Sequence, residues 1–216
     1  FGDKEFSSFE KSLIIQDLDF SYVNDQKVLK NINFVIKKKE TIALIGKSGS
    51  GKSTITDLIS GILVPSKGKI IVDDNDLRDL RILDYRKKIG YVSQDIHLFN
   101  DTIKNNLIWV CDKQEEITDE NILKSLKLSN SIEFVQNLKN GYNSVIGEKG
   151  VQLSGGQCQR IGIARALYKQ VRVLVLDEAT SALDTSTEEA VMNSINNLHK
   201  DLTIIIIAHR LSTLQH

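Results

Sequence analysis

The 216-residue sequence predicts an α/β fold with a helical part set into it. Short apolar, β-branched runs alternate with helix-like segments, which is the pattern of layered folds. Two of these runs, residues 173–176 and 203–207, are apolar apart from Thr203, as expected of parallel strands buried on both faces. Residues 101 to about 150 instead show helical periodicity and no clear strand, so we expect an inserted helical subdomain there.

Strand and helix signals follow one another along the rest of the chain. Asn24-Asp25 is a turn signal between the first two strands. A later helix opens with Thr185-x-x-Glu188, which matches a capping box. The expected strands are residues 13–15, 32–36, 41–45, 69–72, 89–93, 173–176 and 203–207, and the expected core helices are residues 52–60 and 185–198.

Composition argues against several classes of protein. The chain has 28 Lys and Arg against 28 Asp and Glu, whereas nucleic-acid binding needs an excess of basic charge, so we expect no nucleic-acid partner. Cys111 and Cys158 lie in no Cys-x-x-Cys or Cys/His cluster and are expected to be part-buried, although a helix start could lower the pKa of the Cys158 thiol. No run approaches the ~18 apolar residues of a membrane-spanning helix. The polar start at Phe1, without an initiator Met, suggests a fragment of a longer chain.

A glycine-rich segment directly after the strand at residues 41–45 matches the phosphate-binding pattern G-x-x-x-x-G-K-[ST]. Its glycines permit the positive φ angles with which successive N–H groups point at phosphate oxygens. Lys52 offers a cation to the β- and γ-phosphates of ATP, and the Ser53 hydroxyl offers a ligand to Mg²⁺. The alternative is a flexible Gly/Ser loop. The residues expected to bind nucleotide here are Gly46, Lys47, Ser48, Gly49, Ser50, Gly51, Lys52, Ser53 and Thr54.

Two acidic residues end the apolar strand at residues 173–176. Asp177 stands where a carboxylate can hold Mg²⁺, usually through water. Glu178 follows directly, where a carboxylate can orient or deprotonate the attacking water. Such pairs also cap turns, so the phosphate loop is what favours the catalytic interpretation.

A second glycine loop, Leu153-Ser-Gly-Gly-Gln157, precedes a helix-like segment. Ser154 can cap that helix, and exposed N–H groups beside a hydroxyl form a second anion site. One chain with one γ-phosphate needs only one phosphate-binding loop. The second loop therefore suggests that it binds a nucleotide held by a partner. Ser154, Gly155, Gly156 and Gln157 are therefore expected to bind nucleotide.

Together, LSGGQ, the phosphate loop and VLVLDEATSALD resemble an ATP-binding-cassette (ABC) ATPase domain over nearly the whole chain. The resemblance implies an α/β fold of the P-loop NTPase (RecA-like) type, with an antiparallel β subdomain and an inserted α-helical subdomain. It implies one domain over residues 1–216, with the core and β subdomain at about 1–95 and 160–216 and the helical subdomain at about 96–159. It also implies that ATP and Mg²⁺ bind between two copies arranged head to tail.

The same resemblance assigns roles to four more residues. It matches Tyr22 to the aromatic that stacks on adenine, and Gln94 to the glutamine that contacts Mg²⁺ and the attacking water. Asp184 matches a loop that reaches across the dimer, and His209 matches the histidine that contacts the γ-phosphate. The alternatives are a plain strand aromatic, two ordinary loop residues and a core histidine with satisfied hydrogen bonds.

Two segments resemble the exporter type of cassette: Gly147-Glu-Lys-Gly150 and HLFNDTIKNNL after Gln94. In exporters the stretch around Glu148 touches the membrane domain, which implies a transmembrane partner fused upstream of Phe1 and a place at the cytoplasmic face of a membrane. Lys149 and Val145 depart from the usual exporter residues, and a solvated acidic loop is the alternative for Glu148. We expect Trp109 to pack within the helical subdomain.

Two other functions stay open on the sequence. One is a soluble cassette protein that acts on DNA or ribosomes, although such proteins carry two cassettes or a long coiled coil. The other is a scaffold that binds nucleotide without hydrolysing it, against which Glu178 and His209 argue. The transported substrate, its direction, and the choice between a homodimer and a heterodimer cannot be derived from these residues.

Overall fold

Two four-stranded sheets organise the computed structural model, which describes residues 1–22, 27–111, 117–150, 152–169, 171–197 and 202–208. The chain divides into two units. Of the described residues, the first unit comprises 1–22, 27–91, 172–177 and 202–208, and the second comprises 92–111, 117–150, 152–169, 171 and 178–197. The α/β class predicted from the sequence is confirmed. These two compact units are not the same thing as the predicted subdomains, so the predicted subdomain limits stay a prediction.

An antiparallel sheet lies in the first unit, with strand order β2-β1-β4-β5. The two longest strands extend well beyond the predicted residues 13–15 and 32–36. β1 keeps pairing past Ile15 because irregularities in its register with β2 absorb the polar residues there, including Asp17 with a φ of 47°. The Asn24-Asp25 turn lies outside the described residues. The strands are β1 (Ser12–Ser21), β2 (Lys27–Lys37), β4 (Lys67–Val72) and β5 (Asn75–Asp76).

The second sheet has strand order β3-β8-β7-β6. Its strands are β3 (Thr41–Ile45), β8 (Thr203–Ala208), β7 (Val173–Asp177) and β6 (Ile89–Val92). β3 and β7 both run parallel to β8, with Ile45 opposite Ala208 and Asp177 opposite Ile207. All five residues of β7 are buried, which explains the apolar run that predicted it. The carboxyl ends of β3 and β7 therefore meet at one edge of the sheet.

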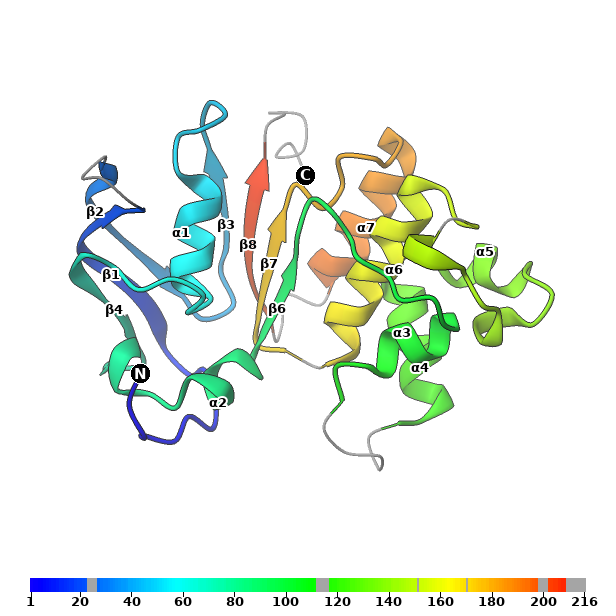
Figure 1. The fold of residues 1–216 in the computed structure, drawn as a ribbon, viewed down its shortest axis with the longest axis horizontal. Helices are drawn as coiled ribbons and strands as arrows, with labels where there is room; N and C mark the ends of the chain where they lie inside the picture. Colours follow the sequence, from blue (N-terminus) through cyan, green and yellow to red (C-terminus); the bar gives the residue numbers. More distant parts are fainter. Residues whose placement is uncertain (23–26, 112–116, 151, 170, 198–201, 209–216) are drawn as a thin grey trace. The chain divides into compact units, whose positions relative to one another are not determined.

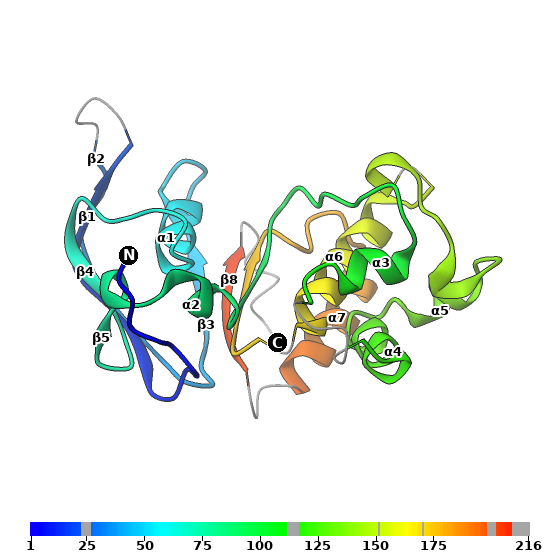
Figure 2. The same cartoon turned by 60° about the horizontal axis from the view of Figure 1, so that its bottom comes forward.

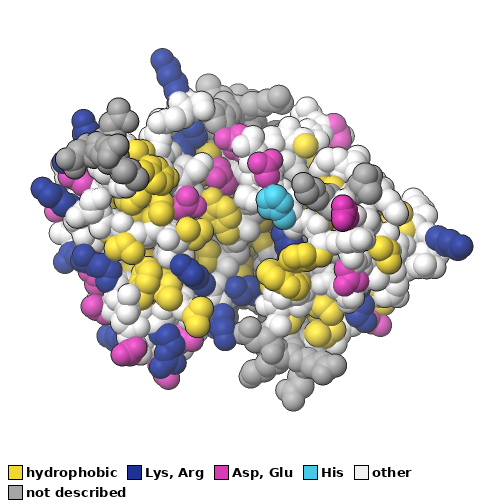
Figure 3. All heavy atoms as spheres, viewed as in Figure 1, with side chains coloured by type: hydrophobic (Ala, Val, Ile, Leu, Met, Phe, Trp, Pro, Cys, Tyr) yellow, Lys and Arg dark blue, Asp and Glu magenta, His cyan; other side chains and the backbone are white. Residues whose placement is uncertain are grey.

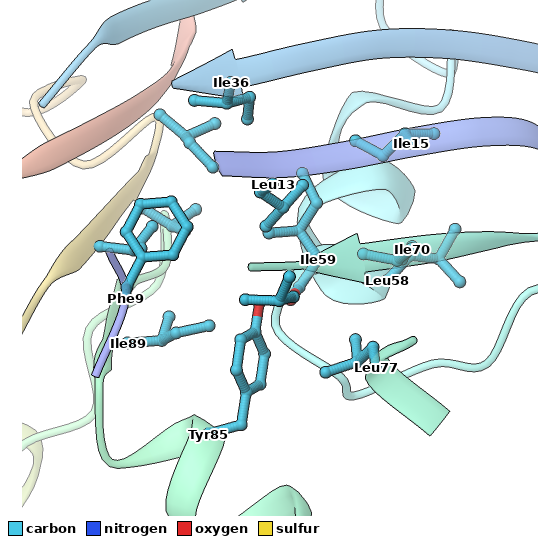
Figure 4. Close-up of a cluster of buried hydrophobic side chains, with 14 of the residues drawn as sticks. Phe9, Leu13, Ile15, Ile36, Leu58, Ile59, Ile70, Leu77, Tyr85 and Ile89 are labelled. Atoms are coloured by element: carbon cyan, nitrogen blue, oxygen red, sulfur yellow. The ribbon is translucent and has the colours of Figure 1, made fainter. Parts of the chain in front are cut away.

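The core of the first unit joins both of its sheet parts to the helix α1 (Lys52–Ile59). In both ribbon views α1 lies between the antiparallel sheet and β3 (Figures 1 and 2). Figure 4 shows labelled side chains from β1, β2, β4, β6 and α1 gathered in this core, with the aromatic ring of Tyr85 reaching into it from α2. Tyr85 belongs to α2 (Ile82–Arg86), and its buried hydroxyl donates to the Ile59 carbonyl at 2.7 Å. The short 3₁₀ helix η1 (Leu77–Asp79) contributes Leu77 to the same core.

The second unit is helical. Its α-helices gather around one another in both views (Figures 1 and 2), and α3, α4, α5 and α6 share an apolar core that includes Ile103, Ile122 and Ile161. Trp109 does not join that core, contrary to the prediction: it is 66% exposed, with its ring 4.8 Å from that of Phe99. The elements are α3 (Ile103–Ile108), α4 (Asp119–Leu128), α5 (Ile132–Gln136), η3 (Gly141–Asn143), η4 (Glu148–Gly150), α6 (Gly155–Tyr168) and α7 (Thr185–Asn197).

The surface carries both signs of charge. On the face shown in Figure 3, Lys and Arg side chains are interspersed with Asp and Glu side chains, in keeping with the formal net charge of +0. Among the helices that the structure describes, none has the length and apolar character needed to cross a membrane.

Leu80→Ala and Leu83→Ala form a matched pair that tests the first core. Leu80 is fully buried in it, whereas Leu83 on α2 is 64% exposed. Leu80→Ala should lower the free energy of unfolding by about 3 kcal/mol, because it removes buried methyl groups and leaves a cavity. Leu83→Ala should change it by less than about 0.5 kcal/mol. Urea denaturation followed by circular dichroism measures both, and equal losses would contradict this core.

Candidate phosphate-binding site

The glycine-rich loop of residues 46–51 connects the end of β3 to the start of α1. Gly51 is the N-cap of α1, with a φ of 89°, a left-handed conformation that L side chains rarely adopt. A Cβ atom on Gly51 would also lie 2.7 Å from a methyl carbon of Leu29. The loop therefore needs glycine at this position both for its backbone angle and for its packing. The first N–H groups of α1 point out of the helix end, as an anion site requires.

Lys52 bends back over this loop. Its side chain is 8% exposed, and its Nζ donates to the carbonyl oxygens of Gly46 at 2.8 Å and of Lys47 at 3.0 Å. The ammonium group is thus held at the mouth of the loop by the backbone that would surround a phosphate. The next two residues differ: Ser53 is exposed, while Thr54 is buried and its Oγ1 lies 3.0 Å from the hydroxyl of Tyr22. Tyr22 itself is exposed, with one ring edge against Phe20.

Asp177 ends β7 at the same sheet edge and is 8% exposed. The hydroxyl of Tyr91, in β6, donates to Oδ2 of Asp177 at 3.0 Å and lies 3.4 Å from Oγ1 of Thr56. Burial raises the pKa of Tyr91 above its usual range, and the nearby carboxylates add to that rise. Burial also raises the pKa of Asp57, and the charge of Asp177 adds to the rise. Tyr91 thus supplies a hydrogen-bond donor to the buried carboxylate of Asp177.

Glu178 and Gln94 belong to the second unit and are described within it. Glu178 has a φ of 51°, a left-handed conformation that is uncommon for a residue with a side chain. Such strain concentrates at functional sites. Gln94 is exposed. His209 lies outside the described residues.

The second glycine loop begins α6 with a reciprocal cap. The Gln157 N–H donates to Oγ of Ser154 at 3.2 Å, and the Ser154 N–H donates to Oε1 of Gln157 at 2.8 Å. The predicted capping role of Ser154 is confirmed. Gly155 and Gly156 form the first helical turn, whose N–H groups have no partner within a helix. The Cys158 thiol follows; it is part-buried as expected, and burial raises its pKa, opposite to the lowering that a helix start could cause.

Asp184, not Thr185, caps α7. Its Oδ2 accepts from the Thr187 N–H at 3.0 Å, and hydrogen bonds from Ser186 and Thr187 hold its pKa well below the usual range. The predicted Thr185–Glu188 capping box is therefore wrong: Glu188 instead accepts from the Thr180 hydroxyl at 2.7 Å. An aspartate one residue before the predicted cap competed for the same role, because aspartate caps at least as well as threonine.

The predicted residues divide between the two units. The first unit holds the phosphate loop, Tyr22 and Asp177; the second holds Ser154–Gln157, Asp184, Gln94 and Glu178. Among the described residues no three His, Cys, Asp or Glu side chains form a metal cluster. One buried carboxylate and one exposed hydroxyl nonetheless fit Mg²⁺, which keeps several waters and takes its other oxygens from phosphates. Sequence reasoning missed Tyr91 and the buried Gln159 of α6, because neither belongs to the quoted motifs.

Comparison with known proteins adds a family and several relatives. The model of the ABC transporter family matches residues 29–181. The chain is 45% identical over 202 residues to an "ATP-dependent lipid A-core flippase" of Vibrio parahaemolyticus, covering 93% of this chain and 34% of that protein. It is 44% identical over 216 residues to the protein of the same name from Pasteurella multocida, covering 100% of this chain and 37% of that protein. The chain thus spans about a third of the length of these relatives.

A solved structure is similar over almost the whole chain. It is described as "Structure of a bacterial Atm1-family ABC exporter with ATP bound", and it superposes with a TM-score of 0.91 at 34% identity. The match covers 98% of this chain and 36% of that one. This likeness confirms the predicted fold, a P-loop NTPase core with an antiparallel β part and a helical part.

Tyr91→Phe tests the contact with Asp177. The substitution keeps the ring and removes only the hydroxyl, which leaves a buried carboxylate without that donor. We expect the free energy of unfolding to fall by about 1–3 kcal/mol at neutral pH. Tyr22→Phe is the comparison, because the Tyr22 hydroxyl lies 3.0 Å from Oγ1 of Thr54 but no buried carboxylate depends on it, so its loss should cost less, at most about 1 kcal/mol. Denaturant titration of both variants measures the difference, and no loss in Tyr91→Phe would argue against the hydrogen bond.

Proposed function

The chain belongs to the ABC transporter family, and on that premise we propose that it binds and hydrolyses ATP as the nucleotide-binding domain of an exporter. The observation that carries the proposal is the phosphate loop with Lys52 folded over it, at the sheet edge where the buried Asp177 ends β7. Ile45, at the end of β3, pairs with Ala208, and Asp177, at the end of β7, pairs with Ile207. The strand pairing therefore brings the phosphate loop and the Asp177 carboxylate to the same edge of the sheet. A generic Gly/Ser connection has no reason to carry a buried lysine.

ATP would lie along the loop with its phosphates at the helix end. N–H groups of residues 46–54 and the Lys52 ammonium would bind the phosphate oxygens. Tyr22, whose ring is exposed, would stack on adenine. Mg²⁺, when bound, would lower the charge on the phosphates, and Ser53, Gln94 and Asp177 are the residues that would hold it.

Hydrolysis would proceed by in-line attack of water on the γ-phosphate. Glu178 would accept the proton of that water or orient it, with Gln94 as a second contact to it. Lys52 would stabilise the charge that develops on the γ-phosphate, and His209 would do the same. The positive φ of Glu178 supports this role, because such backbone strain concentrates at functional sites.

Two domains would share each nucleotide. The Ser154–Gln157 turn presents helix N–H groups and a hydroxyl, which suit a γ-phosphate held by the phosphate loop of a second copy. Asp184 caps α7 at the end of the turn of residues 180–184, and this turn would contact the second copy in the same dimer. A head-to-tail homodimer would then have two composite sites.

The coupling partner would be a membrane domain. The curated relatives are about three times as long as this chain and are named flippases, which favours a flippase-type exporter with transmembrane spans in the same polypeptide. The exposed Glu148 in η4 would face that domain at the cytoplasmic side of the membrane.

Glu178→Gln should retain ATP binding, favour the dimer and lower the turnover number by at least about 100-fold, because the amide cannot accept the proton. Phosphate release and fluorescent-nucleotide binding measure the two properties separately. Glu189→Gln on the exposed surface of α7 is the matched control and should turn over normally. Normal hydrolysis by Glu178→Gln would show that the assigned base is wrong.

Mixing two inactive variants tests the shared sites. Lys52→Ala removes the cation of the phosphate loop, and Gly155→Asp places a carboxylate in the second glycine loop, where it repels phosphate. A mixed dimer has one site with both defects and one site with neither, so we expect phosphate release well above that of either variant alone. If each nucleotide were bound within one chain, both sites of the mixed dimer would be defective and no activity would return.

A further inference from the structure

The buried side chain of Gln159 in α6 links that helix to the turn of residues 180–184. Gln159 is 4% exposed, its Nε2 donates to Oγ of Ser181 at 3.1 Å, and its Oε1 accepts from the Ala182 N–H at 3.0 Å. An N–H group can face only the oxygen of the amide, so the Ala182 contact fixes which way the amide points. Both ends of a buried amide are thus satisfied by one short stretch of chain.

The same turn also packs on the glycine loop that starts α6. A Cβ atom on Gly156 would lie 3.2 Å from the Ala182 carbonyl oxygen and 3.3 Å from Cδ2 of Leu183. A Cβ on Gly155 would lie 3.7 Å from Cβ of Ala182. The two glycines therefore permit a close approach between the loop and the turn. Gln159 lies one helical turn further along α6 and contacts the same turn, through Ser181 and Ala182.

The ends of the turn are fixed by other contacts. The Thr180 hydroxyl donates to Glu188 at 2.7 Å, and Asp184 caps α7, so both ends are tied to α7. Within the turn, the Leu183 N–H donates to the Thr180 carbonyl at 3.0 Å. The hydrogen bonds from Gln159 tie the middle of the turn to α6 instead. Breaking them frees the turn from α6 while α7 keeps its cap.

We propose that Gln159 is a positioning residue that locks the turn of residues 180–184 to the glycine loop of residues 154–157, so that these two partner-facing elements move as one body. The inference deepens the proposed function and rests on it, because both elements are expected to meet the second copy. Because Gln159 holds the glycine loop and the turn in a fixed relative position, binding of the glycine loop to the second copy would also position the turn against that copy. Gln159 would not touch the nucleotide.

The first measurement is local and needs no activity. Gln159→Met keeps the side-chain length and removes both hydrogen bonds. In the full natural polypeptide that contains these residues, amide hydrogen exchange over residues 179–184 should speed up about tenfold or more, because the Ala182 N–H loses its acceptor. Ser181→Ala removes one of the two bonds and should have a smaller effect. Gln136→Met, exposed at the end of α5, is the matched control and should change nothing.

The second measurement separates positioning from nucleotide binding. Gln159→Met should leave ATP affinity in the absence of turnover within about twofold, because the phosphate loop of the same chain is intact. Its turnover number should fall about tenfold, because the second glycine loop and the turn no longer dock together. Gln136→Met should keep both values.

Unchanged exchange over residues 179–184 in Gln159→Met would overturn the lock. Faster exchange with an unchanged turnover number would overturn its role in positioning. Failure of the wild-type protein to hydrolyse ATP would instead overturn the proposed function, and the exchange comparison would still decide whether the lock exists.

Discussion

The parallel pairing of β3 and β7 with β8 is the constraint on which the phosphate-binding half of the site depends. Residues 41–45 pair with 204–208, and residues 173–177 pair with 203–207, so the loop after β3 and the carboxylate that ends β7 share one sheet edge. A slip by one residue would turn every side chain of a strand to the opposite face. Such a slip in β7 would be costly, because all five of its residues are buried and Val173 and Val175 pack in the core of the first unit.

The elements with a strong local pattern were predictable from sequence. Thr41–Ile45 is a strand with the predicted limits, and α1 begins at the predicted Lys52, because a compact apolar strand followed by a glycine loop leaves little choice. β1 was predicted too short, because Gln16 and Asp17 interrupt its apolar pattern and the pairing resumes beyond them. Tertiary pairing, which a single strand's sequence does not contain, decided its length.

The candidate site divides in the same way. The glycine loops and their caps are local in sequence, and the reciprocal bonds of Ser154 and Gln157 span three residues. The contact of Tyr91 with Asp177 joins residues 86 positions apart, and that of Gln159 with Ala182 joins residues 23 apart. No pattern within either segment signals such a contact. Trp109 shows the limit of a prediction from residue type. Large aromatic side chains are mostly buried, yet Trp109 is exposed and packs against the ring of Phe99 at the surface.

The reciprocal cap at the start of α6 also favours ligands that accept hydrogen bonds over ligands that donate them. Oγ of Ser154 already accepts a hydrogen from Gln157, which leaves the hydroxyl proton to point outward. The carbonyl of the Gln157 side chain is likewise turned inward, to the Ser154 N–H. The helix start therefore offers a ligand its N–H groups, while each of the two side-chain oxygens already accepts one hydrogen bond. An oxyanion finds partners there, whereas an ammonium group or a metal ion meets only positive dipole ends.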